Sequence, residues 1–337
     1  QLKHSIKNAV ATKRPLMVWG KPGVGKSAIV AQVAEELGYE MLDWRLCLMD
    51  GVDLRGVPCV VDGLTRWNPP AELPRKSATK KAQRPVLIFM DELPQAEIST
   101  TNAASQLILD RKLGRYTLRE DAVMVAAGNR EEDRATAQRM PTHIANRFKH
   151  VTLDVDAGEW VRWASASKKV DPRVVGFVKY RPALLHTFDP ASKEKAFASP
   201  RSWEYLSDSL CEMDAAKYRP EHDALIEEFA GNVGIAAATE FAGFLQIMNQ
   251  LVDVDAILLT PDKASVPSDP SVLYALCYAL LDRSDAKTFS AVVTYINRIP
   301  SEFAYLFMDE VRKSAEKSGL QKSKDFIAWA LAHQDFV

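Results

Sequence analysis

Apolar residues in the first half of the chain alternate between short continuous runs and runs with helical spacing. Each continuous run is bounded by polar or glycine-containing turns, which is typical of a buried strand. The five predicted strands are Pro15–Trp19, Glu40–Leu46, Val86–Met90, Ala122–Ala127 and Lys149–Leu153. Strands that alternate with helices form parallel sheets covered by helices. The pattern therefore predicts an α/β domain with a parallel five-stranded sheet over residues 1–155.

The second half of the chain carries no strand pattern. From Gly158 onward the apolar residues recur at helical spacing, and the stretch Thr260–Pro270 has the composition of a linker. A last helical run follows this linker. We therefore predict three parts: the α/β core at 1–155, a helical domain at 156–250 and a helical C-terminal extension at 251–337.

Composition narrows the class of protein. The 337 residues are 47% hydrophobic and 26% charged, which is typical of globular proteins, and no stretch is predicted to cross a membrane. A formal net charge of −1 gives no overall attraction to nucleic acid. The four cysteines lack a CxxC spacing, and the six histidines lack a metal-ligand spacing. We expect buried, reduced thiols and a cytoplasmic location.

A glycine-rich motif follows the first predicted strand. Residues 20–27 read Gly-Lys-Pro-Gly-Val-Gly-Lys-Ser, a full match to the phosphate-binding pattern GxxxxGK[ST], and a helical run comes next. Glycines let successive backbone N–H groups face a phosphate, and the helix N-terminus favours its negative charge. The residues predicted to bind the nucleotide are Gly20, Lys21, Pro22, Gly23, Val24, Gly25, Lys26, Ser27 and Ala28. Lys26 is expected on the phosphates and Ser27 on Mg²⁺.

Two carboxylates close the third predicted strand. Val-Leu-Ile-Phe-Met runs directly into Asp91 and Glu92, which is a Walker B pattern. A buried strand would deliver Asp91 to the magnesium ion, while Glu92 would prepare the water that attacks the γ-phosphate. Such acids also cap helices, but the phosphate-binding motif favours the catalytic interpretation.

Two further polar residues are placed for the same chemistry. Asn129 follows the fourth predicted strand, where its amide would contact the water or the γ-phosphate; the alternative is a simple Gly-Asn turn. Arg147 precedes the fifth strand and is the candidate for an arginine that stabilises charge on the transferred phosphate, supplied by an adjacent subunit. Arg134 and Arg139 are its rivals.

In this order, the glycine-rich motif, Phe-Met-Asp-Glu, Ala-Ala-Gly-Asn-Arg and Ala-Asn-Arg-Phe resemble an AAA+ ATPase of the MoxR type, in its phage and prophage branch. The resemblance covers most of residues 1–250. Asp53–Pro58 followed by Gly63–Trp67 is similar to that branch's insertion, a small hairpin that faces the ring pore. Ala-Ser-Pro-Arg-Ser-Trp at 198–203 is similar to the sensor 2 element of a helical lid.

The resemblance implies a hexameric ring with ATP sites between subunits and Arg201 on the nucleotide. It also implies ATP and Mg²⁺ as ligands, a chaperone-like motor that remodels a protein client, and a von Willebrand factor A-type partner. The charged stretch after Asn129 departs from the loop of cellular MoxR proteins. The tail beyond residue 251 has no motif, and a helical buttress is the simpler interpretation.

Other classes of protein fit less well. A guanine-selective NKxD motif is absent, which favours ATP over GTP. A nucleic-acid-remodelling ATPase is an alternative, because there are two basic patches: Arg75, Lys76, Lys80, Lys81 and Arg84 form one, and Arg111, Lys112 and Arg115 the other. Neither is interleaved with aromatic residues that would stack on bases. An ATP-gated scaffold with weak hydrolysis is a third possibility.

Overall fold

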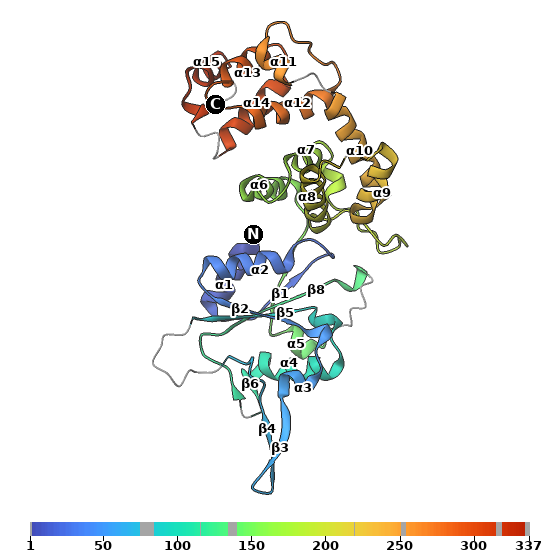
Figure 1. Ribbon diagram of the computed structural model, residues 1–337. Coiled ribbons are helices and arrows are strands. Elements are labelled where there is room, and N and C mark those ends of the chain that lie inside the picture. The colour runs from blue at the N-terminus through green and yellow to red at the C-terminus, as the bar shows by residue number, and fades with distance from the viewer. Residues whose placement is uncertain are drawn as a thin grey trace. The chain divides into compact units, whose positions relative to one another are not determined.

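The computed structural model describes residues 2–74, 84–114, 116–133, 140–218, 220–250, 254–314 and 319–333. The chain forms two compact units (Figure 1). The first comprises residues 1–154 and 188–192, and the second comprises residues 155–187 and 193–337.

The first unit is built on a parallel five-stranded sheet with the strand order β2-β5-β8-β1-β9. Its strands are β1 (Leu16–Trp19), β2 (Glu40–Arg45), β5 (Val86–Asp91), β8 (Val123–Gly128) and β9 (Lys149–Thr152). Its helices are α1 (Leu2–Thr12), α2 (Lys26–Glu36), α3 (Gly51–Arg55), α4 (Ile98–Asp110) and α5 (Thr142–Ala145), with 3₁₀ turns η1 (Leu46–Leu48), η2 (Leu93–Gln95) and η3 (Glu131–Asp133). Two small antiparallel pairs, β3–β4 (Val57–Val61, Leu64–Asn68) and β6–β7 (Lys112–Leu113, Tyr116–Thr117), complete the unit.

The central strands are buried on both faces, because helices cover both sides of the sheet (Figure 1). Alternate residues supply two separate cores. One core packs with α1 and α2 and contains Leu16, Val18, Leu87, Phe89, Val125 and Ala127. The other packs with α4 and contains Met17, Ile88, Met90, Met124 and Ala126. The period of two in a strand thus explains why these runs are continuously apolar.

The predicted parallel sheet is confirmed, and each strand lies within one residue of its predicted bounds. The carboxyl ends of β1, β8 and β5 are adjacent, because β8 pairs with both other strands. Ligands of open α/β sheets bind outside this edge. The helix α1 and the pair β6–β7 had no counterpart in the prediction, and each strand of the pair has only two residues.

The insertion after α3 is a hairpin, in agreement with the resemblance. Strands β3 and β4 pair from Val57 opposite Asn68 to Val61 opposite Leu64. Asp62 and Gly63 form the two-residue turn, with φ values of 53° and 72°. Asp-Gly favours this primed turn, which matches the twist of a hairpin. Both strands expose most of their side chains.

The second unit is helical, and its described residues contain no strand. Its helices are α6 (Ala157–Ser167), α7 (Pro172–Tyr180), α8 (Pro200–Ala215), α9 (His222–Val233), α10 (Ile235–Gln250), α11 (Val254–Leu259), α12 (Pro270–Arg283), α13 (Phe289–Ile296), α14 (Ser301–Lys313) and α15 (Lys324–Ala332), with 3₁₀ turns η4 (Pro182–Leu185) and η5 (Leu320–Lys322). Phe177 of α7 lies at the centre of one core, 5.3 Å from the ring of Trp203 and 5.1 Å from that of Phe241. A second core joins α11 to α15.

The boundary at residue 251 between a helical domain and an extension stays a prediction, since α10 and α12 lie in the same compact unit. None of the helices in the described ranges is long and apolar enough to cross a membrane.

Candidate nucleotide site

The glycine-rich loop connects β1 to the N-terminus of α2. Gly23 and Gly25 have φ values of 76° and 89°, in the left-handed region that glycine adopts without strain. Gly20 has a different constraint: a Cβ atom there would lie 2.8 Å from the carbonyl oxygen of Leu153. The loop thus requires glycine at two positions for conformation and at a third for close packing against the end of β9.

Lys26 is the first residue of α2, and its side chain turns back over the loop. The ammonium donates to the carbonyl oxygens of Gly20 at 2.7 Å and Lys21 at 3.1 Å. It also donates to Oδ1 of Asn129 at 2.8 Å. Because Asn129 directly follows β8, this bond joins the start of α2 to a strand end 103 residues away in sequence. The structure therefore brings the predicted phosphate lysine and the predicted polar residue of the fourth strand together.

Ser27 and Asp91 form a second link between the loop and the sheet edge. The Ser27 hydroxyl donates to Oδ2 of Asp91 at 2.9 Å, and the Glu92 backbone N–H donates to Oδ1 at 3.0 Å. A hydroxyl and a carboxylate are the hard oxygen donors that Mg²⁺ prefers, and Mg²⁺ usually keeps several waters and substrate phosphates as further ligands. The pair fits a magnesium ion without a larger protein cage. Within the described residues, no cluster of three or more His, Cys, Asp or Glu side chains could hold a metal.

Negative charge accumulates beside Asp91. Asp43 lies on β2, which pairs with β5, and burial together with the charge of Asp91 raises the pKa of its carboxyl. This electrostatic environment favours a cation near Asp91.

Glu92 follows Asp91 with a left-handed backbone, φ 56° and ψ 35°, which is uncommon for a residue other than glycine. Its carboxylate accepts a hydrogen bond from the thiol of Cys47. Burial, together with this bond and the charges of Glu92 and Asp91, raises the pKa of Cys47 to about 11. The thiol is therefore a neutral donor at ordinary pH.

Sequence reasoning missed the role of Cys47. The residue lies in η1, just beyond β2, and reaches Glu92 because β2 and β5 are parallel neighbours, with Arg45 opposite Asp91. One indication of this contact was present in the sequence: Cys47 follows the second predicted strand directly, so it lies near the same edge of the sheet as Glu92. The expectation of buried thiols is correct for Cys277 but wrong for Cys211, which is exposed on α8.

The two predicted arginines are both exposed. Arg147 is exposed in the turn after α5, and its side chain makes no hydrogen bond or ion pair within the described part of the chain. Its rivals Arg134 and Arg139 lie outside the described residues. Arg201 is exposed at the start of α8, in the second compact unit, where Ser199 caps the helix. Arg147 makes no hydrogen bond to Lys26, Ser27, Asp91 or Asn129, and the roles of Arg147 and Arg201 in the site stay predictions.

The charged stretch after Asn129 is tied to the end of the first unit. Arg130 forms ion pairs with Asp154 at 2.6 Å and with Glu132 at 3.2 Å. The 3₁₀ turn η3 follows, and the Asp133 carboxylate accepts from the Arg130 backbone N–H at 3.2 Å. The charges that distinguish this loop therefore serve local structure.

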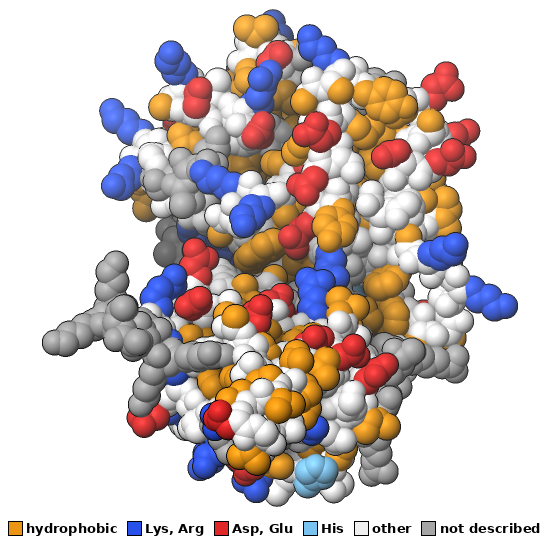
Figure 2. Space-filling view, turned by 60° about the horizontal axis from the view of Figure 1, so that its bottom comes forward, with side chains coloured by type: hydrophobic (Ala, Val, Ile, Leu, Met, Phe, Trp, Pro, Cys, Tyr) orange, Lys and Arg blue, Asp and Glu red, His pale blue; other side chains and the backbone are white. Residues whose placement is uncertain are grey.

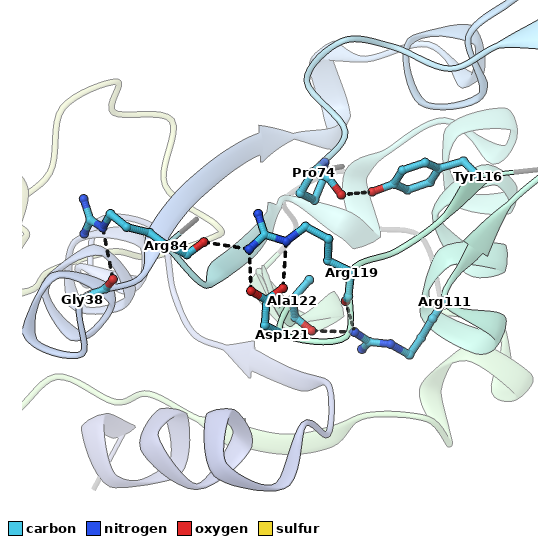
Figure 3. A network of polar contacts seen from close by, with 8 residues as sticks. All are labelled: Gly38, Pro74, Arg84, Arg111, Tyr116, Arg119, Asp121 and Ala122. Carbon is cyan, nitrogen blue, oxygen red and sulfur yellow. Dashed lines mark hydrogen bonds and ion pairs between the residues drawn. The ribbon is translucent and has the colours of Figure 1, made fainter. Parts of the chain in front are cut away.

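Several arginines of the two basic patches also have structural partners (Figure 3). The Arg84 guanidinium donates to the carbonyl oxygens of Gly38 and Tyr39 at 3.2 and 3.1 Å. Arg111 donates to the carbonyl oxygens of Arg119 and Ala122, both at 2.8 Å. The other residues of the first patch, Arg75, Lys76, Lys80 and Lys81, and Arg115 of the second patch lie outside the described residues.

The chain was compared with models of protein families once the geometry of the site was known. Residues 16–152 match the model of the ATPase family associated with various cellular activities (AAA). This range contains the loop, the Walker B strand and Asn129.

Among curated proteins, Midasin of Giardia intestinalis is 26% identical over 166 residues, which cover 47% of this chain. The matched region is 3% of the length of Midasin.

Similar solved structures include a mutant of RuvB from Thermotoga maritima, with a TM-score of 0.41, 15% identity and coverage of 86% of this chain and 82% of RuvB. NtrX of Brucella abortus in complex with ATP has a TM-score of 0.43 and 12% identity, over 100% of this chain and 67% of NtrX. A putative ATPase from Cytophaga hutchinsonii has a TM-score of 0.34 and 12% identity, over 92% of this chain and 79% of that protein.

Proposed function

We propose that this chain, whose residues 16–152 match the AAA ATPase family, binds ATP with Mg²⁺ and hydrolyses it to remodel a protein client. One observation carries the proposal. The hydrogen bonds from Ser27 to Asp91 and from Lys26 to Asn129 bring the phosphate-binding loop, the Walker B strand and the fourth strand to one point of the sheet edge. Phosphoryl transfer depends mainly on positioning and electrostatic stabilisation, which such convergence provides.

Each residue has a distinct role in this proposal. The backbone N–H groups of residues 20–28 and the N-terminus of α2 hold the phosphates, and Lys26 exchanges its present carbonyl partners for phosphate oxygens. Ser27 and Asp91 would hold Mg²⁺, which supplies charge neutralisation on the phosphates when bound. Glu92 accepts a proton from the attacking water, and Asn129 orients that water.

Two arginines extend the proposal beyond one subunit. Arg147 is exposed and unpaired in the described chain, so it is available to the nucleotide of a neighbouring copy. Arg201 would contact the nucleotide from the helical lid. These roles imply a closed ring, and the MoxR-type resemblance favours a hexamer, with a von Willebrand factor A-type protein as partner.

The exposed hairpin favours a protein client. Val57, Val60 and Leu64 are 65%, 77% and 64% exposed, and Trp67 is 49% exposed. Figure 2, in which the hairpin end of Figure 1 comes toward the viewer, shows hydrophobic side chains gathered there among charged ones. Exposed apolar side chains of this kind mark interaction sites for polypeptide.

The nucleic-acid alternative has less support. Arg84 and Arg111 donate hydrogen bonds to backbone carbonyls, so fewer N–H donors of the two patches remain for phosphates. Steady-state ATP turnover distinguishes the alternatives when the chain is mixed with an unfolded polypeptide or with single-stranded DNA. We expect the polypeptide to stimulate turnover and Val60→Asp to remove the stimulation without changing basal turnover.

The matched control is Thr65→Ser. Thr65 lies opposite Val60 on the paired strand, and serine keeps a small polar side chain there. Stimulation by DNA that declines steeply with salt would instead support the nucleic-acid function. Basal turnover that neither ligand changes, even in assembled rings, would favour the ATP-gated scaffold.

A further inference from the structure

His150 of β9 makes two hydrogen bonds that connect different elements of the first unit. Its Nδ1 accepts from the indole Nε1–H of Trp19 at 2.9 Å, and its Nε2 lies 2.8 Å from the carbonyl oxygen of Ala145. Since an indole nitrogen can only donate and a carbonyl can only accept, both bonds require the neutral imidazole with its proton on Nε2. The contacts thus fix one tautomer.

Trp19 is the last residue of β1 and directly precedes the phosphate-binding loop. Its backbone is held between β8 and β9, and its carbonyl oxygen accepts from the Leu153 N–H at 2.7 Å. The next residue, Gly20, accepts the bond from Lys26. The indole is therefore anchored to the same strand end that holds the loop.

Ala145 lies at the other end of this connection. It is the last residue of α5, and its carbonyl oxygen also accepts from the Phe148 N–H at 3.1 Å. Arg147 lies within this turn, where its own N–H donates to Ile144 at 2.9 Å. The four-residue helix has little stability of its own. Its place depends on the burial of Ile144 and Phe148 in a core, and the His150 hydrogen bond adds to this packing.

The His150 ring also packs in a defined orientation. The Trp19 and His150 rings are nearly parallel, with 12° between their planes and 6.1 Å between their centroids, and Phe148 meets His150 edge-on at 6.4 Å. Residues from β1 and from the Arg147 turn therefore pack on one imidazole of β9. None of the sequence motifs includes His150.

We propose that His150 is a positioning residue, which holds the Arg147 turn at a fixed place relative to the strand that leads into the phosphate-binding loop. This inference rests on the proposed function, in which Arg147 serves the ATP of a neighbouring subunit. His150 does not contact the nucleotide. It acts on the neighbour's reaction through the turn.

The test compares His150→Ala with Arg147→Ala in assembled rings. We expect His150→Ala to lower kcat for ATP about 3- to 10-fold, the range of ordinary hydrogen-bond contributions, and to leave KM for ATP unchanged. Arg147→Ala should lower kcat by roughly 10³ to 10⁵. In the Arg147→Ala background, His150→Ala should cause no additional loss, because the two residues act as one unit.

Mixed rings show on which side of the interface His150 acts. Subunits with Lys26→Ala cannot hold ATP but present an intact Arg147 turn. Mixing them with His150→Ala subunits should raise the activity per competent site toward the wild-type value, because some interfaces then combine an intact loop with an intact turn. Mixing with Arg147→Ala subunits should also restore activity and serves as the reference.

A second variant removes the other half of the connection. Trp19→Phe keeps an aromatic ring but lacks the N–H donor, so it should lower kcat by a similar factor, and the double variant with His150→Ala should be no slower than either alone. Additive losses, a raised KM, or His150→Ala subunits that stay slow in mixed rings would overturn the inference. If Arg147→Ala itself leaves turnover unchanged, the proposed role of Arg147 has failed instead.

Discussion

At the scale of single residues, the thiol of Cys47 donates a hydrogen bond to the carboxylate of the proposed general base, Glu92. A carboxylate that accepts a thiol hydrogen bond has one of its oxygens occupied, and Glu92 is further constrained by its left-handed backbone. Through the same contact, the negative charge of Glu92 raises the pKa of the Cys47 thiol. Its raised pKa has burial as the first cause, with Glu92 next.

This relation predicts a change in thiol reactivity. Alkylation requires the thiolate, so Cys47 should react slowly at pH 8 in the wild-type protein. Glu92→Gln removes one negative charge and should raise the alkylation rate of Cys47 several-fold, while burial keeps the pKa above its ordinary value of 9.0. Peptide mass spectrometry after a timed iodoacetamide reaction measures the rate.

Cys211 is the internal control. It is exposed, and its pKa is raised by partial desolvation and then by Asp171, not by Glu92. Equal alkylation rates of Cys47 in the wild-type protein and in Glu92→Gln would show that Glu92 does not affect the thiol.

The raised pKa of Cys47 also affects the free energy of unfolding. Because the pKa is raised in the folded state, the contribution of Cys47 to stability is complete below pH 9.0 and is lost as the pH rises toward about 11.

At the scale of elements, the hairpin β3–β4 depends on a glycine at its base. Gly56 has φ 86° and ψ −170°, a region that is essentially restricted to glycine. A Cβ atom there would lie 1.8 Å from the carbonyl oxygen of Asn68, the residue that follows Trp67 on the returning strand. Any other residue at position 56 would therefore have a strained backbone, and its Cβ would clash with the backbone of Asn68.

Gly56→Ala should destabilise the hairpin more than Gly63→Ala does. Both glycines have positive φ, but nothing lies within 4 Å of a Cβ at Gly63. Conformation alone should cost Gly63→Ala about 1–2 kcal/mol, and the clash should add roughly 1–3 kcal/mol at Gly56. Limited proteolysis across residues 57–68 measures local opening. Equal cleavage rates in the two variants would contradict this explanation.

Sequence reasoning succeeded where the determinants are local. The strand β5 is apolar from Val86 to Met90 because helices bury both its faces. Asp91 ends this strand, and Asn129 directly follows β8. It failed where a contact depends on which strands are neighbours. Neither the Cys47 bond to Glu92 nor the His150 bond to Trp19 has a sequence signature, since each joins residues brought together only by the sheet order.

At the scale of whole units, one ion pair connects distant helices of the second unit. Lys179 of α7 and Glu310 of α14 are 2.6 Å apart, and their side chains are only 16% and 14% exposed. The Lys179 ammonium also lies 4.9 Å from the centre of the Tyr278 ring. Burial lowers the pKa of Lys179, although the charge of Glu310 opposes this effect. The pair therefore joins the sequence before residue 251 to the C-terminal helices.

Breaking this pair should destabilise the second unit. Lys179→Met leaves Glu310 charged and without its partner, and should lower the free energy of unfolding by about 3 kcal/mol. The double variant with Glu310→Leu should recover most of this loss, because apolar residues of similar volume often replace a buried ion pair without cost. Urea denaturation of the full chain measures both. A double variant as unstable as the single one would show that packing, not charge, accounts for the loss.

The central claim for the whole molecule is that the loop, the Walker B strand and Asn129 form one ATP-hydrolysing site. It is tested most directly by measuring Mg²⁺-dependent ATP binding and turnover in the wild-type chain and in Glu92→Gln. The proposed mechanism predicts that the variant binds ATP as tightly as the wild type and hydrolyses it roughly 10²- to 10⁴-fold more slowly, because only the general base is lost. Equal turnover in the two proteins, or a wild-type chain that does not retain ATP with Mg²⁺, would contradict it.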